Sequence, residues 1–311
     1  MVDIQVLLIT MMELFAFIVV GYILVKKHQI SKETNKQISG LVVNVLSPAL
    51  IISSVCVKSD YDGNDIIWQA LGAGVILYLF LILLAKLFNR CLKADEHEAP
   101  VYELLMVFSN TAFIGYPILR VLYGDFAVFV FSLMHMPFNI LIFSYGVYLI
   151  GKGSVKENQK ISIGNILSTG TISSLLAIMI YMTHVNMPVP VVDFLSMLGN
   201  ATIPISMIVI GASLAFLPVK EIISEKKLYI LVAIKLIVLP IILYVLVWKL
   251  PFDDFIKSLV IVSGTLPSAS MVVILSTEYE GDVKAASAGV FLTTLFSIIT
   301  MPLMLNMLLS L

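Results

Sequence analysis

Long apolar runs separated by short polar stretches dominate this chain. A helix that crosses a lipid bilayer needs about 20 mainly apolar residues, because the hydrocarbon core is about 30 Å thick. Ten runs meet this requirement, at residues 4–25, 36–57, 66–88, 101–123, 126–150, 164–183, 191–217, 228–249, 255–276 and 284–308. The pattern predicts an all-α polytopic membrane protein with ten transmembrane helices.

The composition agrees with this prediction and excludes a soluble globule. Apolar residues make up 59% of the 311 residues and charged residues only 13%, and the mean hydropathy is +1.03. Soluble domains contain about 25% charged residues. The lipid bilayer must therefore solvate much of the exterior. No basic cluster of the kind that binds nucleic acid is present, so we expect no nucleic-acid partner.

Lysine and arginine are distributed unevenly between the two sides of the predicted helices. Fourteen of the 19 follow odd-numbered runs, and only Lys58, Arg120, Lys249 and Lys257 lie on the other side. Loops rich in Lys and Arg stay in the cytoplasm. We therefore expect a protein of the cell membrane whose two termini are both extracytoplasmic.

Three short patterns recur in the same order after 154 to 157 residues. They are Asn44-x-x-x-Pro48 with Asn200-x-x-x-Pro204, Ser109-Asn110-Thr111 with Ser263-Gly264-Thr265, and Gly124-Asp125 with Gly281-Asp282. A nearly constant offset close to half the chain indicates an internal repeat. Five helices per copy is an odd number, so the second copy must be inverted, as in many secondary transporters. We predict a first repeat at 1–150, a short cytoplasmic linker at 151–162 and a second repeat at 163–311.

The fourth and ninth runs contain helix-breaking residues at matching positions. Gly115 and Pro117 weaken the fourth, and Gly264 and Pro267 weaken the ninth. Backbone groups that are freed at membrane depth must be buried in protein or line a cavity. Two such breaks in opposite orientation would bring helix ends together near the midplane, where amide ends attract anions and carbonyl ends attract cations. The alternative is that these residues only kink the two helices.

The candidate substrate-binding residues are the polar and helix-breaking residues of these segments and two asparagines that precede prolines. They are Asn110, Thr111, Gly115, Pro117, Ser263, Gly264, Thr265, Pro267, Ser268, Asn44 and Asn200. The two asparagines could instead repair backbone groups freed by Pro48 and Pro204, or do both.

The residues of these motifs resemble the auxin efflux carrier family, which includes plant auxin exporters and bacterial permeases for malate or malonate. The resemblance rests on Leu46-Ser-Pro-Ala-Leu50, on Asn110-Thr-Ala-Phe-Ile-Gly-Tyr-Pro-Ile118 with Tyr123-Gly124, and on Leu266-Pro267 with Glu278-Tyr279. It implies a fold like that of sodium/bile-acid symporters, with the fourth and ninth helices crossing at the substrate site and Asn110 contacting the substrate. The second proline of the plant carriers in the ninth helix is absent near Met271.

Three ionisable residues at depth are candidates for ion or proton coupling. Glu13 could carry a proton or serve as a packing residue, since burial raises the pKa of a carboxyl group. Lys235 lies close to the start of its run, so we expect it to extend to the cytoplasmic face rather than to act as a counter-ion for substrate. His135 could relay protons, although a hydrogen-bonded packing role is the expected one. Glu103 is expected at the membrane interface.

These features predict a secondary active transporter that moves a small organic anion, such as a mono- or dicarboxylate or an auxin-like acid, by alternating access. A proton or sodium ion is the expected coupling partner. No paired deep aspartates and no HExxH, GxSxG or P-loop pattern occur, so we predict no enzyme activity, cofactor or metal site. A channel or a transporter-like sensor is the alternative, and a homodimer is left open.

Overall fold

The computed structural model describes residues 4–56, 65–92, 94–95, 98–151, 169–216 and 226–309, and within these ranges the regular structure is helical. Six described helical segments are long and apolar enough to cross a membrane: Lys32–Ser54, Asp65–Leu92, Asp125–Gly151, Val189–Ala215, Lys227–Val247 and Val283–Leu309. Thr111–Tyr123 and Thr169–Thr183 are shorter apolar helices. The prediction of an all-helical polytopic membrane protein is thereby confirmed. Most of the predicted linker, from residue 152 on, lies outside the described residues.

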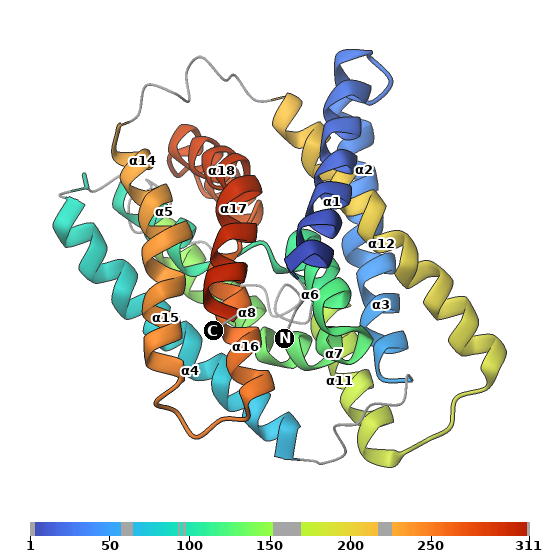
Figure 1. Cartoon of the computed structure of the whole chain (residues 1–311). Coiled ribbons are helices and arrows are strands. Elements are labelled where there is room, and N and C mark those ends of the chain that lie inside the picture. The colour runs from blue at the N-terminus through green and yellow to red at the C-terminus, as the bar shows by residue number, and fades with distance from the viewer. Residues whose placement is uncertain are drawn as a thin grey trace.

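One layer of the molecule is built around a long helix from the second half of the chain. Its elements are α1 (Ile4–Lys26), α2 (Lys32–Leu41), η1 (Val42–Leu46), α3 (Ser47–Ser54), α11 (Thr169–Thr183) and α12 (Val189–Ala215). Helix α12 packs against α1 and α3, and α3 also contacts α11. Figure 1 shows these elements together on the right, so segments from both halves of the chain share one layer.

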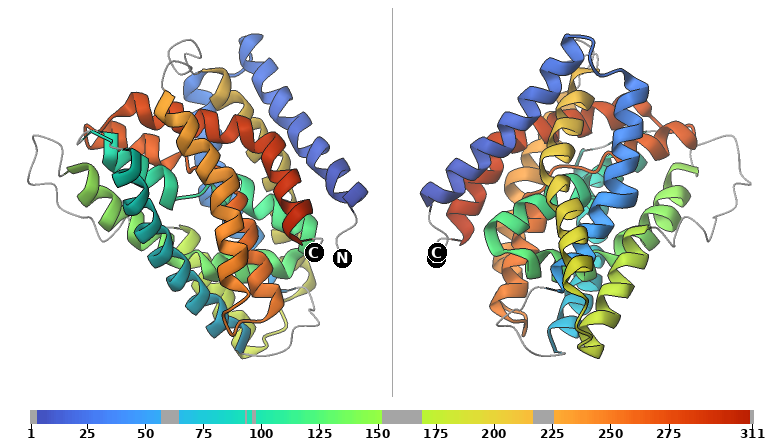
Figure 2. Two further views of the ribbon diagram at one scale, coloured as in Figure 1. Left: turned by 60° about the vertical axis from the view of Figure 1, so that its left-hand side comes forward. Right: turned by 90° about the vertical axis from the view of Figure 1, so that its right-hand side faces the viewer.

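A second group of helices forms the rest of the molecule. It comprises α4 (Asp65–Leu92), α5 (Glu98–Val107), η2 (Thr111–Gly115), α6 (Tyr116–Tyr123), α7 (Asp125–Met134), α8 (Met136–Leu141), η3 (Ile142–Gly146), α9 (Val147–Gly151), α14 (Lys226–Ala233), η4 (Ile234–Val238), α15 (Leu239–Val247), α16 (Asp254–Thr265), α17 (Met271–Glu278) and α18 (Val283–Leu309). Helix α18 contacts α5, α14, α16 and α17. The start of α1 and the end of α18 lie close together at one side of the molecule in both views of Figure 2, and the two helices are in contact.

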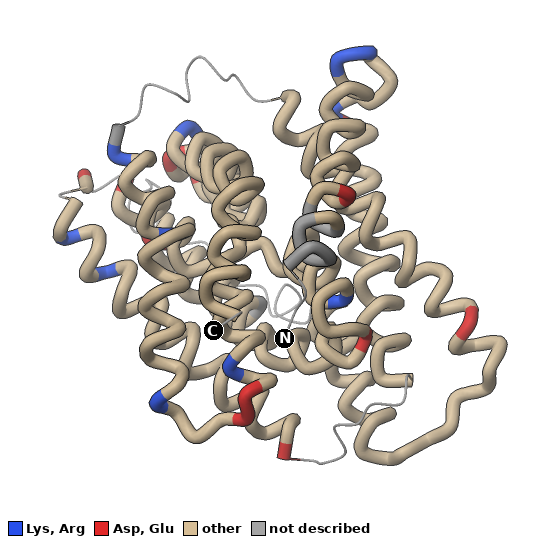
Figure 3. The backbone as a smooth tube through the Cα atoms, viewed as in Figure 1, with Lys and Arg blue, Asp and Glu red and all other residues tan. Residues whose placement is uncertain are grey.

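The outer face of α4 is apolar, as lipid contact requires. Leu79, Leu83 and Leu87 are 58%, 68% and 58% exposed, whereas Leu81 and Ala85 on the other face are buried. A water-soluble helix would carry polar residues on its exposed face. Figure 3 shows long stretches of helix without a charged residue. The hydrocarbon of the bilayer is the solvent that suits this surface.

Three of the helices are widened by one π-helical turn just before a proline. The turns η1, η2 and η4 end two residues before Pro48, Pro117 and Pro240. Proline has no N–H group and its ring clashes with the carbonyl of the preceding turn, and a widened turn relieves both problems. The prolines therefore change which side chains face inward over one turn.

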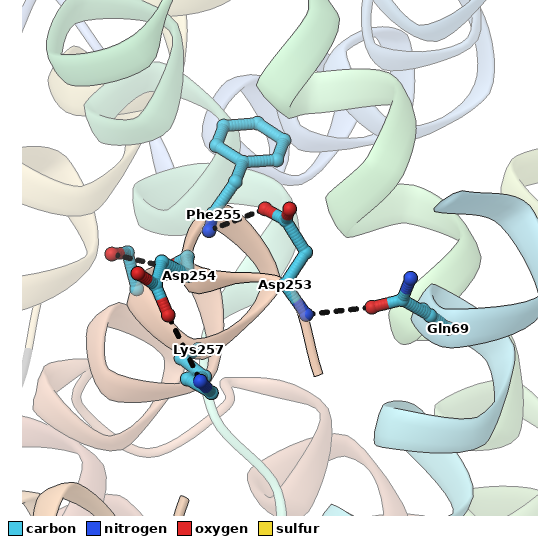
Figure 4. Close-up of polar contacts among 6 residues, drawn as sticks. Gln69, Asp253, Asp254, Phe255 and Lys257 are labelled. Atoms are coloured by element: carbon cyan, nitrogen blue, oxygen red, sulfur yellow. Dashed lines mark hydrogen bonds and ion pairs between the residues drawn. The ribbon is translucent and has the colours of Figure 1, made fainter. Parts of the chain in front are cut away.

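The first turn of α16 is fixed by polar contacts to its own backbone and to α4 (Figure 4). The carboxylate of Asp253 accepts a hydrogen bond from the backbone N–H of Phe255 at 2.8 Å. The backbone N–H of Asp253 donates to the side-chain oxygen of Gln69 at 2.7 Å. This cap sets where the ninth predicted helix enters the membrane and so positions the break that follows.

Two glycines allow α1 and α12 to approach within backbone contact. A Cβ atom at Gly211 would overlap the carbonyl oxygen of Ile18, and one at Gly21 would overlap that of Ile208. Small residues allow membrane helices to pack this closely, and the close packing provides much of their association energy.

We expect Gly211→Ala to lower the thermal unfolding temperature by several degrees, because the added methyl group would force α1 away from α12 at a cost of about 1–3 kcal/mol. Gly72→Ala is the control, since no heavy atom lies within 4 Å of a Cβ at Gly72 in α4. Thermal unfolding of the purified protein in detergent measures both. Equal unfolding temperatures for the two variants would contradict the close contact.

Candidate functional site

The fourth and ninth predicted helices are both interrupted, and their interruptions pair with each other. Between α5 and η2 the chain is extended around Ser109, and between α16 and α17 it is extended around Ser268. The backbone N–H of Asn110 donates to the carbonyl of Pro267 at 2.8 Å, and that of Ala269 donates to the carbonyl of Phe108 at 2.9 Å. The two segments thus form a one-residue antiparallel ladder, here called the crossing.

The crossing is buried in protein. Phe108, Leu266 and Ser268 are fully buried, and Ser109 and Asn110 are only 3% and 4% exposed. Non-helical backbone at this depth is costly unless its donors and acceptors find partners. Here each interrupted helix provides partners for the other, so neither break is stable in this form alone.

Hydroxyl groups from several helices hold the second break in place. The Ser268 hydroxyl donates to the carbonyl of Leu105 in α5 at 2.7 Å. The backbone N–H of Ser268 donates to the hydroxyl of Thr293 in α18 at 3.2 Å. Ser268 therefore connects α16–α17 with both α5 and α18. Thr293 is a residue that sequence reasoning missed, because a buried threonine in an apolar run carries no pattern of its own.

Asn110 caps the half-helix that follows the first break. Its side-chain oxygen accepts a hydrogen bond from the backbone N–H of Phe113 at 3.3 Å, and its carbonyl accepts from Ile114 and Gly115. An asparagine in this position satisfies an amide that the helix start leaves free. The backbone N–H of Thr111, at the start of η2, donates to the carbonyl of Ser109 at 2.9 Å.

Lys235 lies at the crossing and does not extend to the cytoplasmic face. Its ammonium group donates to the carbonyl of Met106 at 2.7 Å and to the hydroxyl of Ser109 at 2.8 Å, and the residue is fully buried. The prediction of a snorkelling lysine is wrong. It counted residues from the start of the run, but the π-helical turn η4 and the nearby carbonyl end of α5 direct the side chain inward.

His135 contacts the second interrupted helix from the end of α7. Its Nδ1 lies 3.0 Å from the carbonyl of Phe131, and its Nε2 lies 3.2 Å from the hydroxyl of Ser263. A carbonyl can only accept, so Nδ1 carries the proton, and in the neutral ring Nε2 accepts from Ser263. The buried histidine also meets the ring of Tyr78 edge-on, with centroids 5.8 Å apart. These contacts fit the hydrogen-bonded packing role.

The structure pairs different residues of the two breaks than the sequence repeat does. The sequence pattern paired Ser109-Asn110-Thr111 with Ser263-Gly264-Thr265, but Ser263 and Thr265 still lie inside α16. Ser109 is bridged instead to Ser268. The recurring residues therefore mark the right helices but not equivalent positions, while the predicted helix breaker Pro267 does lie in the second break.

The predicted glycines serve close packing around the crossing. A Cβ at Gly115 would lie 3.1 Å from Leu266 of the other break, so Gly115 lets the half-helix η2 lie against the crossing. A Cβ at Gly264 would lie 2.6 Å from Leu243 of α15. Pro117 lies in the first turn of α6, Thr111 begins η2, and the hydroxyl of Thr265 bonds within its own helix at 2.8 Å.

The other candidates lie away from the crossing or differ from expectation in burial. Asn44 and Asn200 are exposed on the layer around α12, and the Asn44 side chain accepts a hydrogen bond from Thr169 at 3.2 Å. Glu13 is exposed on α1, away from the crossing. Glu103 is 6% exposed and accepts a hydrogen bond from Tyr145.

Comparison with known sequences agrees with this architecture. The profile of a family described as Membrane transport protein matches residues 6–305. An uncharacterized transporter of Methanocaldococcus jannaschii is 26% identical over 301 residues, which cover 92% of this chain and 94% of that relative. An uncharacterized transporter of Methanothermobacter thermautotrophicus is 22% identical over 295 residues, which cover 94% and 96%.

The helical fold, its lipid-facing surface and the family match identify the molecule as a membrane transporter. The chain belongs to the auxin efflux carrier family, the membrane transport proteins whose profile covers nearly all of it. The family that the motifs around Pro48 and Asn110 indicated is thereby confirmed.

We expect Thr293→Val to destabilise the protein by about 1–3 kcal/mol, because valine has the same shape but leaves the buried amide of Ser268 without its acceptor. Thr300→Val on the same helix is the control, since the exposed Thr300 hydroxyl bonds to the carbonyl of Phe296 within its own helix. Thermal unfolding compares the two. A Thr293→Val variant no less stable than Thr300→Val would show that this hydrogen bond does not support the crossing.

Proposed function

We propose that the protein is a secondary active transporter that moves a small organic anion across the cell membrane by alternating access, with the crossing as its substrate site. The observation that carries the proposal is the pairing of two interrupted helices in buried, extended backbone. Broken helices whose ends meet at depth are how many transporters bind substrate and coupling ions.

The charge distribution at the crossing favours an anion. The half-helices that start at Thr111 and Met271 both direct their amide ends toward it. The amide end of a helix carries about half a positive elementary charge. Lys235 adds a positive charge and covers the carbonyl end of α5. A mono- or dicarboxylate or an auxin-like acid is therefore the substrate class that we propose.

The position of the crossing suits alternating access. The half-helix η2, which follows directly on the crossing, packs against α12 of the other layer. Helix α3 of that layer contacts α7, the helix that ends directly before His135. Relative movement of the two groups of helices would therefore change access to the crossing from each side of the membrane.

We further propose ten spans in two inverted repeats, at 1–150 and 163–311, joined by a short cytoplasmic linker. Each interruption falls in the fourth helix of its five-helix half. The start of α1 and the end of α18 lie close together, which fits an even number of crossings. The asymmetry of Lys and Arg supports an extracytoplasmic location for both of these helix ends.

Coupling to a proton or sodium gradient is part of the proposal. Of the three candidate coupling residues, His135 contacts the interrupted helix α16 and Lys235 contacts the crossing itself, whereas Glu13 lies on the outer surface of α1. The first two are the ones that a moving crossing would affect directly.

Counterflow in proteoliposomes tests the proposed function. Vesicles preloaded with an unlabelled carboxylate should transiently accumulate the same labelled carboxylate above equilibrium, because a carrier exchanges substrate through one alternating site. Empty liposomes are the control. A channel would give equilibration without a transient peak, and a sensor that binds without flux would give no uptake, so either result would replace the carrier proposal.

Asn110 variants test the charge of the substrate. Asn110→Asp keeps an oxygen that can cap η2, and a negative charge at a helix start is tolerated, so we expect near-normal stability. The same charge should repel an anion and abolish the rise in unfolding temperature that carboxylates produce in the unmodified protein. Asn110→Ser, which keeps a capping oxygen without charge, is the matched control and should retain part of the response. An undiminished response of Asn110→Asp would exclude an anion site at the crossing.

A further inference from the structure

Lys235 is an unusual charge for its location. It is fully buried in a π-helical turn within an apolar helix, and in the part of the chain that the structure describes it forms no ion pair with a carboxylate. A buried ammonium without a partner would be very costly. Its partners are the carbonyl oxygen of Met106 and the hydroxyl of Ser109.

The carbonyl end of α5 explains why a cation is stable here. Helix α5 ends at Val107, so the carbonyl of Met106 is one of the last four, which have no partner within the helix. That end carries a partial negative charge, which a cation stabilises. Lys235 thus supplies the positive charge that the interrupted helix requires.

The sequence around Lys235 holds it in this position. The turn η4 (Ile234–Val238) is widened ahead of Pro240, five residues after Lys235. Neighbouring Leu236 is 1% exposed, so the surrounding turn is packed on the protein interior. The ammonium group reaches the crossing from a continuous helix, while the groups it contacts belong to an interrupted one.

We infer that Lys235 is a positioning residue whose tethered ammonium group occupies the place of a bound cation at the carbonyl end of α5. By bonding Met106 and Ser109 together it holds the first break in the geometry that pairs with Pro267. The crossing is therefore assembled without an added inorganic cation at this point. The inference concerns assembly, and only its consequence for anion binding rests on the proposed function.

The test is the unfolding temperature of Lys235→Ala in different salts of equal ionic strength, measured on the purified full chain without substrate. Removing the side chain should lower the unfolding temperature by roughly 5 °C or more in choline chloride. It also leaves space for a small free cation. We expect n-propylammonium chloride to restore a large part of the loss in a saturable manner and to leave the unmodified protein unchanged.

Three comparisons make the result specific. Leu236→Ala opens a cavity in the same turn without removing a charge, so n-propylammonium should not rescue it more than choline does. Lys235→Met fills the space with an apolar chain and should be destabilised without rescue. Lys235→Arg keeps a cation and should be more stable than Lys235→Met.

Several results would overturn the inference. The first is an equal response of Lys235→Ala and Leu236→Ala to n-propylammonium. The second is a Lys235→Met variant that is as stable as the unmodified protein. The third is a stabilisation by sodium that the unmodified protein shows and Lys235→Ala lacks. If Lys235→Ala cannot be purified in choline chloride, n-propylammonium during solubilisation should recover monodisperse protein, and failure to do so also counts against the inference. Because no substrate or flux is measured, these outcomes are independent of the counterflow experiment.

Discussion

Backbone N–H and C=O groups inside a membrane must find partners within the protein, and the arrangement of this molecule follows from that constraint. The two interrupted helices meet it jointly, because Asn110 and Pro267, and Ala269 and Phe108, complete each other's hydrogen bonds. A continuous helix would meet the same requirement more simply. The interruptions therefore have no evident benefit for stability, and a role of the half-helix ends in transport, as proposed above, would account for them.

Only a few polar side chains determine the electrostatics of the crossing. One lysine covers the carbonyl end of α5, one asparagine caps η2, and hydroxyl groups of Ser109, Ser268 and Thr293 connect the surrounding helices. In a surrounding of low dielectric constant each of these contacts is stronger than it would be in water, and each unsatisfied group would cost more. Small changes in the position of the half-helices would therefore have large electrostatic effects, which would suit the alternating substrate site proposed above.

Close backbone contacts lie within the two groups of helices. Gly21 and Gly211 bring α1 and α12 into contact in one group, and Gly74 lies against the backbone of Met134 in the other. Such contacts require both backbones to stay in place, because no flexible side chain separates them. The contact of η2 with α12 lies between the groups, directly after the crossing. This division favours movement of one group against the other over rearrangement within either.

The membrane class, the family and the identity of the two broken helices could all be predicted from the amino-acid sequence. Apolar runs long enough to span a bilayer, and Gly and Pro within two of them, are local features, and local features suffice where every backbone group of a helix is satisfied within the helix. The motif around Asn110 identified the first broken helix, but the predicted helix breakers Gly115 and Pro117 lie in η2 and α6, after the extended segment around Ser109. The second break lies at Pro267, which was one of the predicted helix breakers, although Ser109 and Ser263 do not occupy equivalent positions in the ladder.

Which polar groups meet depends on the packing of distant segments, and the sequence pattern did not predict it. Lys235 and Ser109 are 126 residues apart along the chain, and Ser268 and Thr293 are 25 apart. The hydrophobic pattern shows how far a lysine lies from the end of its apolar segment, but it does not show in which direction the side chain points. That direction was set by a proline-induced turn in one helix and an unpartnered carbonyl at the end of another. The exposure of Asn44 and Glu13 likewise followed from which faces of their helices find neighbours, since such packing leaves no periodic signal in so uniformly apolar a sequence.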